Sequence, residues 1–236
     1  MKMNRLTQTL LALGALAVPA QAATLAVGTE IGIDFGPTAP TNNFNGTATT
    51  AFGGAPGTDG SITAGTLIDT SGTTIDVVGF TWENAAWSNT DSADLTDLPG
   101  QNSAFNDSNL TDWIGRNNTD VFALTFTGLN DAFTYDLIIG HGFVNTTTFT
   151  DTTYTVDGQS LTNTHDSGSG AYVSFTGLST DGSGNLVITL DGNGGPSNNT
   201  PDLAVVSALQ LTAVPEPSAA LLGAFGVLAL LRRRRS

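Results

Sequence analysis

Apolar and polar side chains alternate along residues 25–35. The odd positions from Leu25 to Phe35 are apolar or threonine, and the even positions are small or charged. This period of two is typical of a strand with one buried face. Gly36-Pro37 ends the pattern, and residues 38–58, which are rich in Asn, Thr, Gly and Pro, are predicted to form a long loop.

Two further apolar runs, Ile62–Asp69 and Thr74–Trp82, are separated by residues 70–73, which predicts a hairpin. From Glu83 to Asp120 the alternation breaks into a polar stretch with scattered aromatic and aliphatic residues. This stretch is predicted to form loops, with room for one short strand or helical turn.

The second half of the chain repeats short apolar runs between turn signals such as Asp157-Gly158 and Asp181-Gly182-Ser183-Gly184. The predicted strands are Val121–Thr127, Phe133–Ile139, Thr147–Val156, Tyr172–Phe175, Leu186–Leu190 and Leu203–Leu211. About nine short strands without an amphipathic helix between the ends predict an all-β fold. We expect a single β-sandwich domain over residues 23–213.

The N-terminal end has the pattern of a secretory signal peptide. Lys2 and Arg5 precede an apolar stretch at residues 10–18, and small residues follow it at Ala20 and Ala22. A basic start, an apolar centre and an A-x-A site predict cleavage after Ala22. Residues 1–22 are therefore assigned to the signal peptide.

The C-terminal end contains an apolar segment, residues 218–231, that stops at four basic residues, Arg232, Arg233, Arg234 and Arg235. As a helix it would rise about 21 Å, against about 30 Å for the hydrocarbon core of a bilayer. Because the segment is apolar on every face, lipid is its predicted surrounding. The arginines would hold its end on the cytoplasmic side, so the rest of the chain would lie outside.

Directly before this segment stands Val214-Pro215-Glu216-Pro217. The motif, the apolar segment and the basic end occur in the order of the PEP-CTERM sorting tail, which residues 214–236 resemble. The resemblance implies an exported protein of a Gram-negative bacterium and an exosortase-type membrane protease as a partner. It also implies a precursor tethered to the inner membrane by its C-terminal helix, which then moves to the cell surface or the extracellular matrix.

Charge is distributed very unevenly along the chain. Of its 7 Lys and Arg residues, six lie in the two ends, which leaves Arg116 alone in the predicted domain. Its acidic residues number 21, and all except Glu216 lie in the domain, whose net charge is about −19. Nucleic-acid binding is excluded, because it requires several Lys or Arg side chains against the phosphates. Phosphorylated substrates are disfavoured for the same reason.

The composition also limits cofactors. There is no cysteine, so disulfides and thiolate zinc sites are excluded, and His141 and His165 are too few for an imidazole site. The Asp-Gly turns at Asp181 and Asp191 lack EF-hand spacing and are interpreted as tight turns. We predict no cofactor. A calcium ion held by carboxylates of separate loops stays open, and the sequence identifies no ligands for it.

Several strand segments resemble the malectin-like and galactose-binding-like jelly rolls of many PEP-CTERM proteins. These segments are Ile33-Asp34-Phe35-Gly36, Phe126-Thr127-Gly128-Leu129, Tyr135-Asp136-Leu137, Tyr154-Thr155-Val156-Asp157-Gly158 and Leu203–Leu211. The resemblance implies a jelly-roll β-sandwich whose relatives often bind glycans through loops.

The candidate glycan-binding residues lie in the irregular region, where a sandwich carries its function. Trp87 and Trp113 could stack on a sugar ring, while Asp112 and Asn117 could bind its hydroxyl groups. The alternative is that both tryptophans pin a long loop by packing. Trp82 is a further candidate sugar platform, and the alternative for it is a core position at the end of a strand. Arg116 is expected to pair with an aspartate inside the domain.

No motif for an enzyme nucleophile is present, so the protein is predicted not to be an enzyme. The favoured hypothesis is an exported, acidic surface or matrix protein with a carbohydrate-binding ectodomain and polysaccharide as its ligand. A passive structural matrix protein without a specific ligand is the alternative. A carbohydrate-active hydrolase is a remote third hypothesis, because its two carboxylates cannot be chosen among so many.

Overall fold

The computed structural model describes residues 25–35, 43–47, 53–90, 112–117, 122–141, 152–163, 171–192 and 203–216. The predicted signal peptide and the tail from Pro217 onward lie outside these residues. Within them, no helix has the length and apolar character needed to cross a membrane. The regular structure of the described part is entirely β, as the sequence pattern predicts.

Fifteen strands form in the described residues rather than about nine. They are β1 (Glu30–Asp34), β2 (Asn45–Gly46), β3 (Gly53–Ile62), β4 (Leu67–Ile68), β5 (Thr74–Ile75), β6 (Gly79–Thr90), β7 (Asp112–Asn117), β8 (Phe122–Thr127), β9 (Phe133–His141), β10 (Thr152–Val156), β11 (Gln159–Asn163), β12 (Ala171–Leu178), β13 (Leu186–Gly192), β14 (Leu203–Val206) and β15 (Ala208–Pro215).

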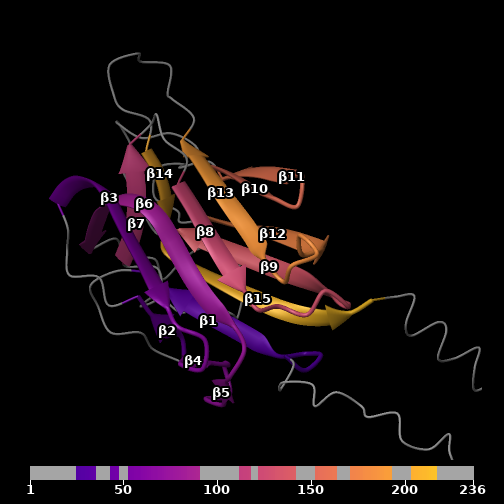
Figure 1. Ribbon diagram of the computed structural model, residues 1–236. Helices are drawn as coiled ribbons and strands as arrows, with labels where there is room; N and C mark the ends of the chain where they lie inside the picture. Colours follow the sequence, from indigo (N-terminus) through magenta and orange to yellow (C-terminus); the bar gives the residue numbers. More distant parts are fainter. Residues whose placement is uncertain are drawn as a thin grey trace, which may run out of the picture.

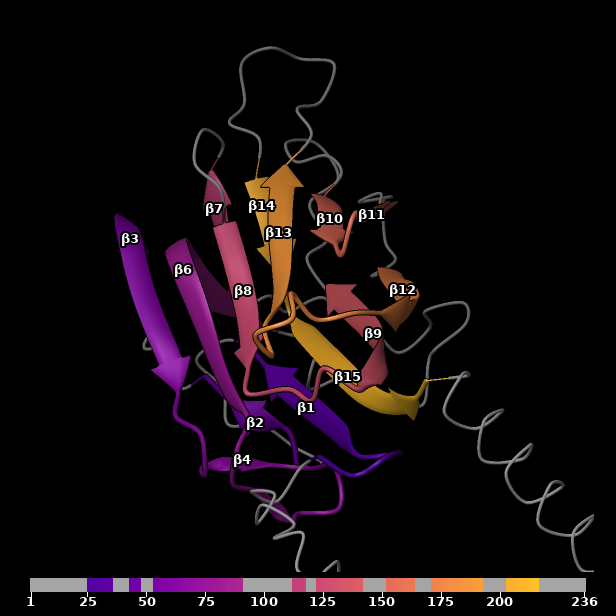
Figure 2. The same ribbon diagram turned by 45° about the vertical axis from the view of Figure 1, so that its right-hand side comes forward.

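These strands build two large sheets (Figures 1 and 2). One has five strands in the order β12-β9-β15-β1-β2, and the other has eight, in the order β11-β10-β13-β8-β6-β7-β14 with β3 added beside β6. β4 and β5 form a separate hairpin. β1 and β15 pair antiparallel from Glu30 opposite Thr212 to Asp34 opposite Ala208. The two ends of the described domain therefore lie side by side in one sheet.

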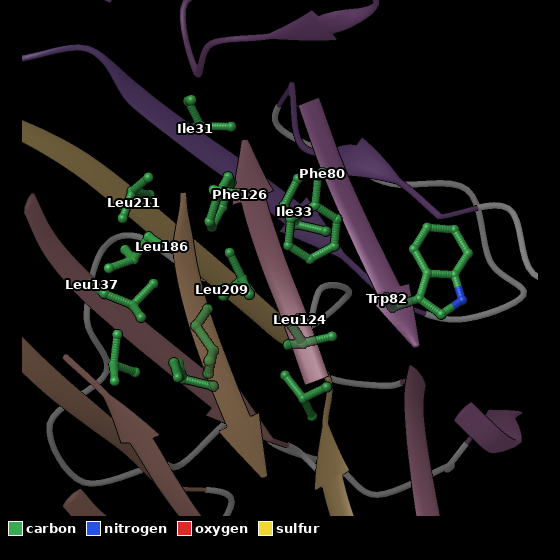
Figure 3. Close-up of a cluster of buried hydrophobic side chains, with 14 of the residues drawn as sticks. Ile31, Ile33, Phe80, Trp82, Leu124, Phe126, Leu137, Leu186, Leu209 and Leu211 are labelled. Atoms are coloured by element: carbon green, nitrogen blue, oxygen red, sulfur yellow. The ribbon is translucent and has the colours of Figure 1, made fainter. Parts of the chain in front are cut away.

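Alternate residues of both sheets point into one shared core (Figure 3). The five-stranded sheet contributes Ile33, Leu137 and Leu209, and the eight-stranded sheet contributes Phe80 and Phe126; all five are 0% exposed. This alternation of buried and half-buried residues is clearest in β8 and β10, where it follows the period of two in the sequence. The two sheets thus pack face to face as a β-sandwich.

Aromatic rings join the two sheets. The Phe80 ring lies 4.9 Å from that of Phe126 on the neighbouring strand and 5.8 Å from that of Phe35, which follows β1 in the other sheet. Both pairs are tilted, the arrangement that the charge distribution of aromatic rings favours. The core is therefore continuous from one sheet to the other.

The last predicted strand, Leu203–Leu211, is two strands in different sheets. β14 pairs with β7 and β15 pairs with β9 and β1, with Ser207 between them. The Ser207 N–H donates to Gly140 O at 3.0 Å, and its carbonyl oxygen accepts the Phe35 N–H at 2.8 Å. A strand that changes sheets closes one corner of the sandwich. An apolar run does not reveal this change, since both halves are buried.

Tyr154 and Thr152 of β10 stabilise this corner through hydrogen bonds to Val205 of β14. The Tyr154 hydroxyl group donates to Val205 O at 2.6 Å, and the Val205 N–H donates to Thr152 Oγ1 at 3.2 Å. Complete burial raises the pKa of Tyr154 far above its usual value, so the phenol stays a neutral donor. β10 is thereby fixed to β14.

The first half of the chain departs most from the sequence expectation. Residues 53–58 belong to β3 instead of a loop, Ile62–Asp69 divides between β3 and β4, and Glu83–Thr90 continues β6. β3 has no alternating pattern and is a strand because it pairs with β6. Gly60 faces Trp82 in this ladder, and a Cβ atom at Gly60 would overlap the indole ring. Pairing and close packing, rather than strand propensity, decide this element.

The outer face of the five-stranded sheet is covered near β1. The Phe44 ring lies on Gly32, where a side chain would come within 2.7 Å of it. The buried Asn45 amide donates to Gly32 O and Ile68 O, both at 2.8 Å, and accepts the Ile68 N–H at 2.8 Å. The hairpin of β4 and β5 is thereby held against β1.

Candidate ligand-binding region

The four predicted glycan-binding residues lie on two paired strands, with position 112 on the opposite face of the sheet from positions 87, 113 and 117. Trp87 lies on β6, and Asp112, Trp113 and Asn117 lie on β7, with Trp87 opposite Gly115 and Asn89 opposite Trp113. Since directly opposite residues share a face, backbone positions 87 and 113 are diagonal neighbours on the same face of the sheet. This ladder is at the end of β6 far from its first residue, Gly79 (Figure 2).

The Trp113 side chain is covered in this arrangement. It is 5% exposed, and its Cζ3 atom lies 3.4 Å from the point where a Cβ of Gly115 would stand. The same Cβ would approach Ala204 O to 2.5 Å, so a glycine is needed where β7 meets both the indole and β14. The burial of Trp113 favours the packing alternative for this residue, and its role in sugar stacking stays a prediction.

Trp82 belongs to the core, as the packing alternative for this residue predicts. It is 5% exposed, and its ring centroid lies 6.5 Å from that of Phe80. Figure 3 shows the indole at the margin of the core cluster, directed away from Leu124 and Phe126. The residue therefore seals the core beneath β3 and offers no sugar platform.

Arg116 fixes the ladder from within. Its side chain is 8% exposed, and its Nη1 atom donates to Asn84 O at 2.9 Å. Asn84 has a φ of 64°, and its N–H donates to the Asp59 carboxylate at 2.8 Å. The described contact of Arg116 is thus to a carbonyl oxygen, and the expected pairing with an aspartate stays a prediction. β3, β6 and β7 are connected through these groups.

The Asp181 turn is a tight turn stabilised by its own carboxylate. The Asp181 side chain accepts the Ser183 N–H at 2.8 Å, the Asn185 N–H at 3.1 Å and the Asn185 amide at 3.0 Å. Of the second turn, Asp191 and Gly192 end β13, and the residues that follow lie outside the described ones. The described part of the chain holds no group of three or more His, Asp or Glu side chains placed to bind a metal ion.

The hydrogen bond from the Asn185 amide, followed by those from the two N–H groups, lowers the pKa of Asp181 below its ordinary value of 3.8. A carboxyl whose pKa is lower in the folded state stabilises the fold fully above the unfolded value, and this contribution is lost as pH falls through the folded value. We expect the turn to open only in acid below about pH 3.8. Carboxylate titration by NMR, with Ser183 and Asn185 amide shifts as reporters, measures this. A pKa at or above that of a free aspartate would contradict it.

The outer face of the eight-stranded sheet is a surface that the sequence pattern does not predict. Its hydroxyl groups pair across strands: Thr153 Oγ1 lies 2.8 Å from Thr162 Oγ1, and Thr155 Oγ1 lies 2.8 Å from Ser160 Oγ. The uncharged residues of this hydroxyl face are Ser61, Thr81, Ala123, Thr125, Thr127, Thr153, Thr155, Ser160, Thr162, Val187 and Thr189. The sequence pattern that could have indicated this face is threonine at alternate strand positions. Strand propensity alone also explains that pattern.

A scan against models of known protein families finds no match, and a search of curated proteins finds none either. Among solved structures, the ANX2 ectodomain from Arabidopsis thaliana is similar, with a TM-score of 0.50 and 9% identity over 80% of this chain and 50% of that chain. A complex of the plant peptide RALF23 with FER and LLG2 contains a similar chain, with a TM-score of 0.50 and 11% identity over 84% of this chain and 54% of that one.

A third structure is the CBM36-1 domain of a multidomain xylanase from the hindgut metagenome of Trinervitermes trinervoides. It matches 52% of this chain and 95% of that chain at 19% identity with a TM-score of 0.31, which is too low to support an argument. The chain spans about half the length of the two plant chains. At these identities the likeness concerns the fold alone.

Proposed function

We propose that this protein is an exported surface or extracellular-matrix protein, sorted through its PEP-CTERM tail, whose β-sandwich binds a neutral polysaccharide. The observation that carries the sorting proposal is the order of motif, apolar segment and basic end in residues 214–236. The likeness to plant ectodomains agrees with a domain that works outside the cell. An exosortase-type protease is the partner that this tail would require.

The end of the domain limits where such a protease could cut. β15 lies between β9 and β1 in the middle of its sheet, and its ladder continues to Pro215, opposite Phe133. A cut before Val214 would remove residues from a central strand, so we infer cleavage after Pro215. Pro215 itself is exposed, and a proline there ends the strand because it has no N–H to donate.

Replacing Glu216 by Ala should block removal of the tail while export continues. Intact-mass measurement of protein recovered from the producing cells should then find residues 1–22 absent from both forms. The tail should be absent from the wild type and retained by Glu216→Ala. Glu83→Ala, which removes an exposed carboxylate elsewhere on the chain, is the matched control. Normal loss of the tail from the Glu216 variant would refute the role of the motif.

Polysaccharide binding is supported by the pairing of β6 with β7, which places positions 87, 113 and 117 on one face of the sheet. Neutral polymers are favoured because a domain with a net charge of about −19 repels anionic ones. The hydroxyl face adds a surface of groups that both donate and accept hydrogen bonds, with the carboxylates Glu83 and Asp191 among them. A passive matrix protein is the second candidate, and the burial of Trp113 favours it.

A glycan array together with quenching of tryptophan fluorescence distinguishes these two candidates. Trp87→Ala should weaken binding of a neutral glycan about 5- to 30-fold, because a stacked aromatic ring is worth roughly 1–2 kcal/mol. The control is Leu161→Ala, which removes a 38% exposed apolar side chain from β11. If neither the array nor fluorescence responds to any sugar, the passive candidate is correct.

A further inference from the structure

The tail leaves the sandwich at a definite end. Pro215 is opposite Phe133 at the start of β9, and the Phe133 N–H donates to Asn130 O at 3.0 Å in the preceding turn. Figures 1 and 2 both show β15 ending at one extremity of the molecule, with β7 and β14 toward the other. The turn at Asn130 therefore lies next to the point where the chain leaves the domain.

This end is acidic, and hydrogen bonds to its carboxylates connect the turns. The Asp131 carboxylate accepts hydrogen bonds from Thr180 Oγ1 at 2.5 Å and the Gly184 N–H at 2.9 Å, and the Asp157 carboxylate accepts the Ser179 N–H at 2.9 Å. Three turns are thus joined through residues 179–184. We define the acidic end as Asp131, Asp157, Asp181 and Glu216. Arg116 is the one Lys or Arg side chain among the described residues, and it lies on β7.

One exposed apolar residue belongs to the same end. Val27 is 51% exposed, and its neighbour Gly28 donates its N–H to Ala213 O at 2.8 Å. The first residues of the described domain therefore lie beside the last ones. A valine in this place would tolerate a position close to lipid headgroups.

Little chain separates this end from the predicted membrane segment. Glu216 and Pro217 alone stand between Pro215 and Ser218, so the connection spans at most about 11 Å. Two prolines further restrict how it can bend. While the tail is in the membrane, the sandwich cannot turn over freely above the bilayer.

The ladder with the predicted glycan residues lies at the opposite end. β6 starts at Gly79, opposite Thr127 and next to the acidic end, and reaches Trp87 eight residues later. At about 3.4 Å per residue this is about 27 Å along the strand. The register of β6 with β7 places Asp112 and Trp113 still further along.

We propose that the tethered chain stands on its acidic end against the bilayer and presents the ladder of β6 and β7 outward. This orientation rests on the proposed function, because it requires residues 218–231 to be the membrane anchor. The whole domain is acidic, so anionic headgroups would repel its sides as well as its end. Because the tail anchors the acidic end, the domain then stands upright instead of lying on its side. Polysaccharide outside the cell then meets the ladder before the tail is cut.

The absence of cysteine from the chain allows a clean test with single labels. Ser183→Cys and Ala132→Cys place a fluorophore at exposed positions of the acidic end. Thr162→Cys places it at an exposed position of β11 opposite Thr153, about 10 Å further along the strands than Val156. The full-length chain is inserted into phosphatidylcholine and phosphatidylglycerol vesicles that carry a headgroup quencher. Either acidic-end label should lose most of its fluorescence, and the Thr162 label should lose clearly less.

Ionic strength provides a second readout of the same orientation. At 1 M salt the Debye length falls to about 3 Å, so the repulsion weakens and quenching of the acidic-end labels should increase further. Equal or stronger quenching of the Thr162 label in vesicle-bound protein overturns the orientation and leaves the sorting proposal intact. Failure of the full chain to float with the vesicles overturns the membrane tail, and with it both proposals.

Discussion

Gly128→Ala is expected to destabilise the domain by about 3 kcal/mol, which lowers the melting temperature by about 6–12 °C. Gly128 has a φ of 73°, a left-handed conformation that costs an alanine about 1–2 kcal/mol. In addition, its Cβ would overlap the carbonyl oxygen of Val77, a backbone atom that cannot rotate away. Thermal unfolding followed by circular dichroism measures the change.

Gly158→Ala separates these two causes. Gly158 has a φ of 72°, nearly the same conformation, yet nothing lies within 4 Å of the position of its Cβ. Its substitution should therefore cost only the conformational part, about 1–2 kcal/mol. If both variants lose the same stability, the contact between Gly128 and Val77 is looser than the structure has it.

Phe126→Ala should have the second large effect, a loss of about 3–5 kcal/mol of unfolding free energy. Phe126 is 0% exposed on the central strand β8, and its ring contacts Phe80 at 4.9 Å between centroids. Removing the ring leaves a cavity between the two sheets, which the surrounding strands can close only in part. Urea unfolding with a constant slope would report this loss directly.

Thr125→Ala is the control for Phe126→Ala. Thr125 is the preceding residue of the same strand and lies on the outer face, so its substitution should cost less than about 1 kcal/mol through strand propensity. A loss as large as that of Phe126→Ala would mean that the hydroxyl face is covered. A small loss at both positions would mean that the described core does not carry the stability of the domain.

Local sequence patterns predict the all-β fold class of this protein and its most regular strands. In β8, β10 and β13 a period of two places alternate residues in the core, and the turn at Asp157-Gly158 has φ of 47° and 72°, as an Asp-Gly hairpin turn requires. These features are local, because neighbouring residues alone decide which face is buried and which backbone angles are allowed. For the same reason, the sequence predicts the two ends of the chain, which lie outside the described residues.

The tertiary structure alone decided which segments pair and which side chains end up covered. β3 contains four glycines and one proline, and it is a strand only because it pairs with β6. The apolar run at Leu203–Leu211 hides a change of sheet at Ser207, and Trp113 is buried because β14 and Gly115 leave room for its ring. Such outcomes depend on partners distant in sequence, whose free energy of packing outweighs local propensity. The acidic end and the ladder of β6 and β7 lie at opposite ends of the sandwich for the same reason, because strand register places them there.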